Sequence, residues 1–190
     1  MLNSAVVLTH GAGGNCESKL LIAVDKALTD AGLTVRRFNL PFRERRSQGP
    51  PFPAEAATDR EAIRQAVAAM KDAGYSRVIA AGHSYGGRQA TMLASEDPKA
   101  VDGLLLLSYP LHPPRRPDQL RTGHLPSVQA PALFVHGTRD PFGSIDEMEA
   151  ALQLVGGPTQ LSVVEGAGHD LKSGKFDLVR SVVTPLLALK

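Results

Sequence analysis

The sequence has little of several features that would place it outside ordinary soluble proteins. It contains one cysteine, Cys16, in 190 residues. A single thiol cannot form an internal disulfide, so the fold has to be held by packing, which fits a reducing compartment. No run of 18 apolar residues occurs, which argues against a membrane-spanning helix. The opening MLNSAVVLTHGAGG lacks the basic stretch of a secretory signal. We therefore predict a cytoplasmic protein without a membrane partner.

Strong charge of either sign is also missing. The formal net charge is +2. This argues against a nucleic-acid partner, because a protein that binds nucleic acid usually carries a dense basic patch. Hydrophobic residues make up 43% and charged residues 21% of the chain, as in ordinary globular proteins. The length predicts one domain over residues 1–190.

Short apolar segments alternate with longer segments of helical periodicity along the chain. This alternation predicts an α/β fold, with a doubly wound, mostly parallel sheet of about six strands and helices on both faces. The predicted strands are 5–9, 34–39, 77–82, 103–107, 131–136 and 160–165. The predicted helices are 19–31, 58–73, 87–95, 144–154 and 171–189, the last of them bent near Pro185. Residues 43–53 are expected to form a loop.

The third predicted strand runs into the sequence GHSYGG at residues 82–87, which contains the pattern G-x-S-x-G. Between a strand and a helix, this pattern indicates a sharp turn that presents Ser84 at the carboxyl edge of the sheet. The alternative is a glycine-rich turn with an ordinary helix-capping serine. A serine hydroxyl needs a base to become a nucleophile.

Candidates for the base and its supporting acid follow later strands. His169 lies in GAGHD after the last predicted strand, and Asp140 lies in HGTRD after the fifth. Both should reach the same sheet edge as Ser84, in the order serine, acid, histidine. Asp146, inside the next helix, and Asp170, adjacent to the base, are weaker candidates for the acid. A loop histidine and an Asp-Pro turn are the alternatives without catalytic roles.

These three motifs, in this order, resemble the α/β-hydrolase superfamily over nearly the whole chain. The sequence is similar to a small, cap-less group of hydrolase-like proteins that includes testis-expressed and NSL-complex-subunit relatives. Dienelactone hydrolases are a more distant resemblance, since they typically carry a cysteine where this chain has Ser84. The resemblance implies a Ser84–Asp140–His169 triad and no cofactor.

The glycine-rich segment after the first strand has a role implied by the same resemblance. Ala12 and Tyr85 would supply the two backbone N–H groups of an oxyanion hole, and Gly11 and Gly13 would allow substrate to approach. Dinucleotide binding is an alternative use of such a loop. It is disfavoured because the last glycine of G-x-G-x-x-G would fall on Cys16 and no P-loop lysine is in register.

Histidines at strand ends raise the alternative of a metal site. His10, His83 and His136 could cluster near Ser84, but the chain has no H-E-x-x-H motif. We expect each histidine to bond local backbone, and we predict no metal.

The loops bear on the substrate. Only residues 108–129 separate the fourth strand from the fifth, too few for a lid domain, so we expect a shallow, open site with Tyr109, Leu111 and Phe142 at its rim. Two arginine clusters could favour an anionic acyl group or an acidic partner, although solvated loop charge explains them as well; they are Arg43, Arg45 and Arg46, and Arg115, Arg116 and Arg121.

Together these features predict a serine hydrolase that acts on a small-molecule ester or thioester through an acyl-enzyme. Two alternatives remain at this stage. One is a non-catalytic interaction module on a hydrolase scaffold, because fold alone does not determine function. The other is a peptidase or a different hydrolytic reaction at the same site. The oligomeric state is not determined by the sequence.

Overall fold

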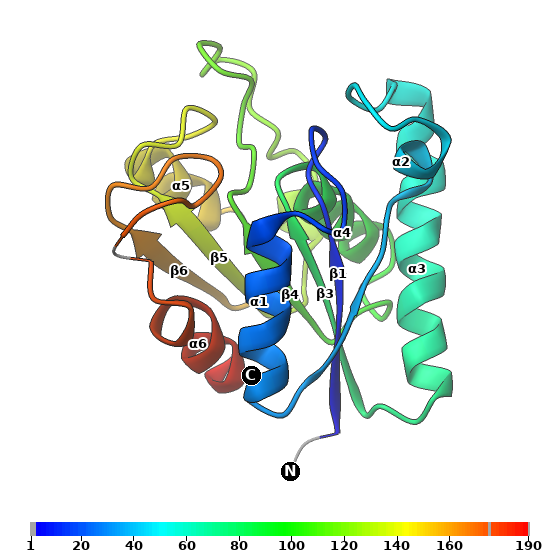
Figure 1. Cartoon of the computed structure of the whole chain (residues 1–190). Coiled ribbons are helices and arrows are strands. Elements are labelled where there is room, and N and C mark those ends of the chain that lie inside the picture. The colour runs from blue at the N-terminus through cyan, green and yellow to red at the C-terminus, as the bar shows by residue number, and fades with distance from the viewer. Residues whose placement is uncertain (1–2, 175, 190) are drawn as a thin grey trace.

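The computed structural model describes residues 3–174 and 176–189. Its centre is a six-stranded sheet with the strand order β2-β1-β3-β4-β5-β6, in which every neighbouring pair is parallel (Figure 1). The predicted α/β sheet is therefore confirmed. The strands are β1 (Ser4–Thr9), β2 (Thr34–Arg37), β3 (Arg77–His83), β4 (Gly103–Leu107), β5 (Ala132–Gly137) and β6 (Thr159–Val164).

Helices cover both faces of this sheet. The helical segments are α1 (Lys19–Asp30), α2 (Pro41–Arg45), η1 (Pro53–Glu55), α3 (Ala56–Asp72), α4 (Tyr85–Glu96), η2 (Leu125–Ser127), α5 (Ile145–Leu152), η3 (Val179–Val183) and α6 (Thr184–Ala188). In the described part of the chain, η2 is the only helix between β4 and β5, so no cap domain covers the carboxyl edge of the sheet.

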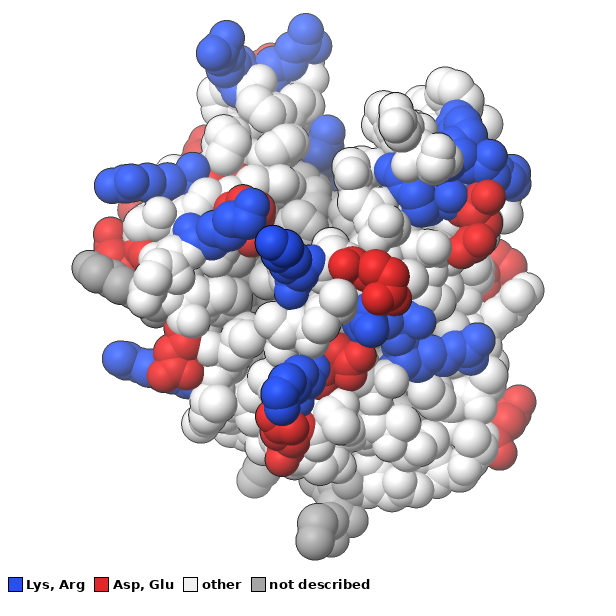
Figure 2. Space-filling model, in the orientation of Figure 1, with Lys and Arg blue, Asp and Glu red and all other residues white. Residues whose placement is uncertain are grey.

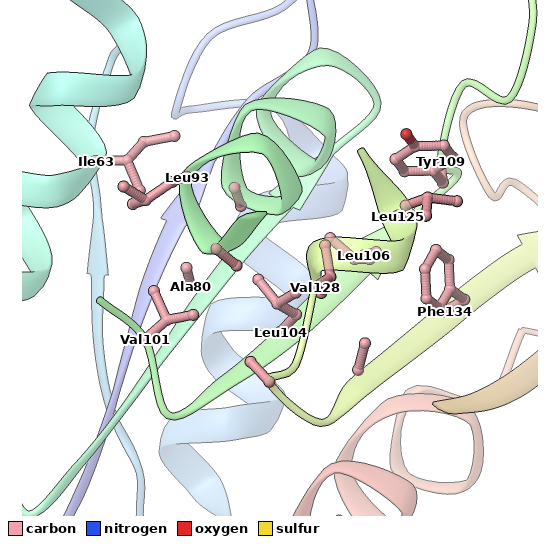
Figure 3. Close-up of a cluster of buried hydrophobic side chains, with 14 of the residues drawn as sticks. Ile63, Ala80, Leu93, Val101, Leu104, Leu106, Tyr109, Leu125, Val128 and Phe134 are labelled. Atoms are coloured by element: carbon pink, nitrogen blue, oxygen red, sulfur yellow. The ribbon is translucent and has the colours of Figure 1, made fainter. Parts of the chain in front are cut away.

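The apolar strands supply two cores because successive side chains point to opposite faces. Leu104 and Leu106 pack with α3 and α4 in one core, which Figure 3 shows around Ile63 and Leu93. Leu105 and Leu107 pack with α1, η3 and α6 in the other. All five residues of β4 are buried, as expected for a central parallel strand.

One predicted helix and one predicted loop differ from the structure. Residues 171–174, 176 and 177 are not helical, and the last helical segment starts after them as the π-helix η3, followed by α6. Pro185 lies in the first turn of α6, where a missing N–H is tolerated, so the irregular helix precedes it. The segment 43–53, expected as a loop, begins within α2, whose N1 residue Pro41 has a backbone angle suited to starting a helix.

None of the described helices is long and apolar enough to cross a membrane.

Candidate active site

The turn after β3 holds Ser84 in a backbone conformation that side chains rarely adopt. Its φ is 50° and its ψ is −112°, and it is the N-cap of α4. Glycines make this turn possible, because a Cβ on Gly86 would lie 2.7 Å from the carbonyl oxygen of His10. A Cβ on Gly87 would lie 2.8 Å from the carbonyl oxygen of Gly82. The strained turn presents the Ser84 hydroxyl above the sheet edge.

Three predicted residues meet at that edge. The Oγ of Ser84 is 2.8 Å from Nε2 of His169. The Nδ1 of His169 is 3.0 Å and 2.9 Å from the two carboxylate oxygens of Asp140. The Asp140 side chain is fully buried, whereas the His169 side chain is 23% exposed. The arrangement leaves Nε2 of His169 free to accept the serine proton when Nδ1 carries the hydrogen.

The backbone around Asp140 holds its carboxylate in place. The backbone N–H of Phe142 donates to Oδ1 of Asp140 at 2.9 Å. The Phe142 ring stacks on the imidazole of His169, with 4.1 Å between ring centroids. The weaker acid candidates lie elsewhere: Asp146 lies in the first turn of α5, and Asp170 pairs with Lys172 at 2.8 Å.

His83, one residue before the serine, supports the base loop. Its Nε2 donates to the carbonyl oxygen of His169 at 2.7 Å. Burial lowers the pKa of His83 from 6.5 to about 4, so the ring is neutral near pH 7 and its proton is available for this bond. The sequence analysis noted His83 in the serine motif but did not predict this hydrogen bond to the His169 loop.

The other strand-end histidines also bond backbone, as expected. His10 Nδ1 donates to the carbonyl oxygen of Gly11 at 2.9 Å, and His136 Nε2 donates to that of Gly143 at 2.8 Å. Burial lowers the pKa of both rings. Within residues 3–174 and 176–189, no group of three or more His, Cys, Asp or Glu side chains is placed to hold a metal ion.

The two expected oxyanion donors line the same cleft as Ser84. Tyr85 is the first residue of α4, so its N–H has no acceptor within the helix. Ala12 lies in the loop after β1 and lines the same cleft, with Gly11 and Gly13. The Tyr85 hydroxyl donates to the buried Asp59 at 2.7 Å, and burial is the largest cause of the raised pKa of Tyr85.

Arg43 holds the loop that contains Ala12. Its guanidinium donates to the carbonyl oxygens of Ala12 at 2.7 Å and Gly14 at 2.8 Å. It also donates to those of Gly49 at 3.0 Å and Arg46 at 3.1 Å. Arg43 is only 7% exposed. From the sequence, Arg43 was grouped with the charges of a loop. In the structure, its hydrogen bonds connect the loop that contains Ala12 and Gly14 to the segment that contains Arg46 and Gly49.

A cleft of about 1450 Å³ surrounds Ser84, larger than the shallow site expected from the sequence. Figure 2 shows the surface hollowed between the part that carries α2 and the part that carries residues 110–125. Phe52, which is 63% exposed, lines the cleft from the segment before η1. The proline-rich run PPFP at 50–53 was the signal that could have identified it.

The predicted rim was wrong for two of its three residues. Phe142 lines the cleft, but Tyr109 is 1% exposed and Leu111 is fully buried. Their side chains pack in the core with Phe134, because the turn after β4 directs the chain inward: Ser108 has a φ of 49°. Their neighbour Pro110 lines the cleft instead.

Comparison with known proteins agrees with this architecture. A family model described as "Alpha/beta hydrolase domain" matches residues 3–180. The chain belongs to this family. It is therefore an enzyme of the hydrolase class.

Solved structures with the same fold include three with informative names. Est1E from Butyrivibrio proteoclasticus is 18% identical with a TM-score of 0.76, over 97% of this chain and 87% of that one. A dienelactone hydrolase from Anabaena variabilis is 23% identical with a TM-score of 0.71, over 97% and 83%. XC6422 from Xanthomonas campestris, described as a serine hydrolase without lid, is 20% identical with a TM-score of 0.70, over 97% and 83%.

Proposed function

We propose that this hydrolase cleaves carboxylic esters by an acyl-enzyme mechanism, with Ser84 as nucleophile, His169 as general base and Asp140 as the acid that orients it. The observation that carries the proposal is the hydrogen-bonded chain from Asp140 to His169 at 2.9 Å and from His169 to Ser84 at 2.8 Å. A serine in a strained turn, aligned with a base and a buried carboxylate, is the arrangement that activates a hydroxyl for acyl transfer.

In the first half-reaction, Nε2 of His169 takes the proton of Ser84 as its Oγ attacks the ester carbonyl. The carbonyl π electrons move onto the oxygen, and Asp140 stabilises the imidazolium that forms. When the tetrahedral intermediate collapses, His169 gives the proton to the leaving alcohol. In the second, His169 deprotonates water as the water oxygen attacks the carbonyl of the acyl-serine. The imidazolium then returns the proton to Oγ of Ser84 as the bond between Oγ and the acyl carbon breaks and the acid is released.

The N–H groups of Ala12 and Tyr85 are the proposed donors to the oxyanion. Their support is positional, since both residues line the cleft beside Ser84 and the Tyr85 N–H is left free at the start of α4. Losing one such donor lowers kcat by about 10²–10³-fold in comparable sites. Gly11 and Gly13 would let the substrate carbonyl approach this loop.

The substrate is proposed to be a small ester or thioester. The cleft opens to solvent without a cap, and Phe52 and Phe142 give it apolar walls. The fold is shared with two solved structures, Est1E and a dienelactone hydrolase. The finer resemblance to the testis-expressed and NSL-complex-subunit group stays a prediction, as does a cytoplasmic location.

Reaction with a fluorophosphonate probe, followed by intact mass, tests this function. We expect one adduct on the wild type and on the control Ser47→Ala, because Ser47 is exposed and outside the cleft. We expect none on Ser84→Ala, and very slow labelling of His169→Ala. Hydrolysis of p-nitrophenyl butyrate should fall at least about 10³-fold in both site variants.

Two results would contradict the proposal. One is a folded wild type that neither takes up the probe nor hydrolyses any ester. The other is labelling that persists in Ser84→Ala, which would move the nucleophile elsewhere. Circular dichroism of each variant separates loss of chemistry from loss of fold.

A further inference from the structure

Two arginines enter the cleft beside Ser84 without a carboxylate to pair with. Arg88 lies one turn into α4, and Arg121 lies in the segment between β4 and β5. Both line the cleft. Among residues 3–174 and 176–189, neither makes an ion pair, although most arginines near α3 and α2 do.

Arg88 is placed by the same turn that places the nucleophile. Its backbone N–H donates to the carbonyl oxygen of Ser84 at 2.9 Å. Four residues along a helix correspond to about 6 Å of rise, so the backbone of Arg88 lies about one turn of α4 from that of Ser84. Its Nε is buried and has no hydrogen-bond partner among the described residues. Buried donors in native proteins are normally satisfied, so this group is unusual.

Arg121 is held from both sides of its backbone. Its N–H donates to the carbonyl oxygen of Leu111 at 2.8 Å, and its own carbonyl accepts from the Tyr109 hydroxyl at 2.8 Å. One guanidinium nitrogen makes a long bond, 3.3 Å, to the carbonyl oxygen of Pro110. The buried Tyr109 thus has a structural role here, in fixing the segment that carries Arg121 into the cleft.

The two guanidinium groups also repel each other. Burial is the first cause of the lowered pKa of Arg121, and the charge of Arg88 is the second. The same two causes, burial and then Arg88, lower the pKa of His124 to about 4, which keeps that neighbouring ring neutral. Among the residues that the structure describes, no carboxylate contributes to the pKa of Arg121 or His124, so none offsets this positive charge. Clustered cations in a partly buried site are unfavourable unless an anion joins them.

The other charged side chains that line the cleft leave it positive overall. Lys19 and Lys172 line it too, and the one carboxylate of the lining outside the triad, Asp170, is already paired with Lys172. The cleft is therefore positive where substrate has to enter, which favours an anionic ligand.

We propose that the substrate of this esterase carries a carboxylate, bound by Arg88 and Arg121 while its ester carbonyl lies at Ser84. This inference rests on the proposed ester hydrolysis and narrows its substrate class to half-esters and other esters of anionic compounds. A guanidinium presents paired N–H donors that match a carboxylate, and the bound anion would relieve the repulsion between the two arginines.

The experiment compares matched esters, p-nitrophenyl butyrate and the p-nitrophenyl monoester of glutaric acid, which differ in a terminal carboxylate. An arm with the carboxylate on the leaving group uses butyrate esters of phenol and of 4-hydroxybenzoate. The readout in each arm is the ratio of kcat/KM for the anionic ester to that for the neutral one. We expect a ratio well above one for the wild type in at least one arm.

Substitution tests whether the arginines cause that preference. In Arg88→Gln and Arg121→Gln the ratio should fall by about 10- to 100-fold, the range expected for losing a charged hydrogen bond. Arg88→Lys should restore part of it. Arg116→Gln is the matched control, because Arg116 is exposed on the same segment as Arg121 and does not line the cleft. A ratio unchanged from this control in both variants would overturn the proposal.

A binding measurement separates failure of this inference from failure of the proposed function. Millimolar glutarate should raise the Tm of the wild type and slow fluorophosphonate labelling, whereas neutral glutaramide should do neither. The Tm effect should disappear in Arg88→Gln. If the protein hydrolyses neither ester, the Tm comparison still decides the anion site, and the absence of a glutarate effect on the wild type would rule it out.

Discussion

Arginines lie on both sides of Ser84, and the two sides use them differently. Arg43 is 7% exposed and donates to four backbone carbonyls, including that of Ala12. Arg88 and Arg121 line the cleft, and the described residues provide neither with an ion pair. A guanidinium whose donors are used by backbone is part of the structure, whereas one that faces a cleft with free donors is available to a ligand.

The comparison also separates residues that look alike in sequence. Arg43, Arg45 and Arg46 form one cluster along the chain, yet Arg45 and Arg46 pair with Glu55 and only Arg43 reaches the loop beside the nucleophile. The arginine clusters of the sequence were thus neither all solvated charge nor all substrate contacts. Position relative to the sheet edge decides which role each one has.

The largest effect is expected from Arg43→Met. Removing the guanidinium leaves carbonyls of the Ala12 loop without donors, so the free energy of unfolding should fall by about 2–4 kcal/mol. With the proposed oxyanion loop loosened, kcat for a neutral ester should fall by about 10²-fold. Urea denaturation and steady-state kinetics measure the two effects.

The matched control for Arg43→Met is Arg45→Met. Arg45 has a 52% exposed side chain and one ion pair at 3.2 Å, so its loss should cost at most about 1 kcal/mol. Equal stability and kcat in the two variants would contradict the role assigned to Arg43.

A smaller effect of opposite sign is expected from Arg88→Met. This change removes a buried Nε without a partner and the repulsion with Arg121, so stability should stay the same or rise by up to about 1 kcal/mol. Urea denaturation at low salt is the measurement. A loss of stability as large as that of Arg43→Met would contradict the difference in role that we assign to Arg43 and Arg88.

The smallest effect concerns the titration of His124. Burial first, and then Arg88 and Arg60, lower its pKa to about 4, so removing Arg88 should raise that pKa while leaving it below 6.5. Between pH 6.5 and 4 the unfolded chain binds a proton that folded His124 does not, so stability falls as the pH drops through this window. Arg88→Met should make that fall shallower.

Titration of His124 by NMR in three proteins checks this prediction. The wild type and Arg43→Met should give the same pKa, since Arg43 does not contribute to the shift of His124. An unchanged pKa in Arg88→Met would show that Arg88 lies farther from the imidazole than the structure indicates.

Local patterns were enough to predict the sheet and the edge at which Ser84, Asp140 and His169 meet. The apolar strands such as 103–107 and the glycines of GHSYGG determine buried parallel strands and a tight turn, because both depend on residues close together in sequence. Chain order then predicted that Ser84, Asp140 and His169 lie at one edge. Segments with weaker local signals, such as 171–174, were predicted wrongly as helix.

The sequence did not predict which loop side chains point into the core and which line the cleft. Tyr109 and Leu111 were expected at the rim and are buried, whereas Phe52 and Arg88 line the cleft. The reason is that a loop residue points inward or outward according to contacts with segments far away in the chain, as when Tyr109 packs on Phe134.

The sequence by itself determined the α/β architecture, the serine turn and the chain order of Ser84, Asp140 and His169, since each depends on short-range pattern and on the parallel topology that follows from it. Only the tertiary structure decided the hydrogen-bond distances among those residues, the hydrogen bonds by which Arg43 holds the Ala12 loop, and the lack of an ion pair for Arg88 and Arg121 among the described residues. Those features depend on which distant groups come into contact, and a pairing between a guanidinium and its acceptor leaves no periodic trace in the sequence.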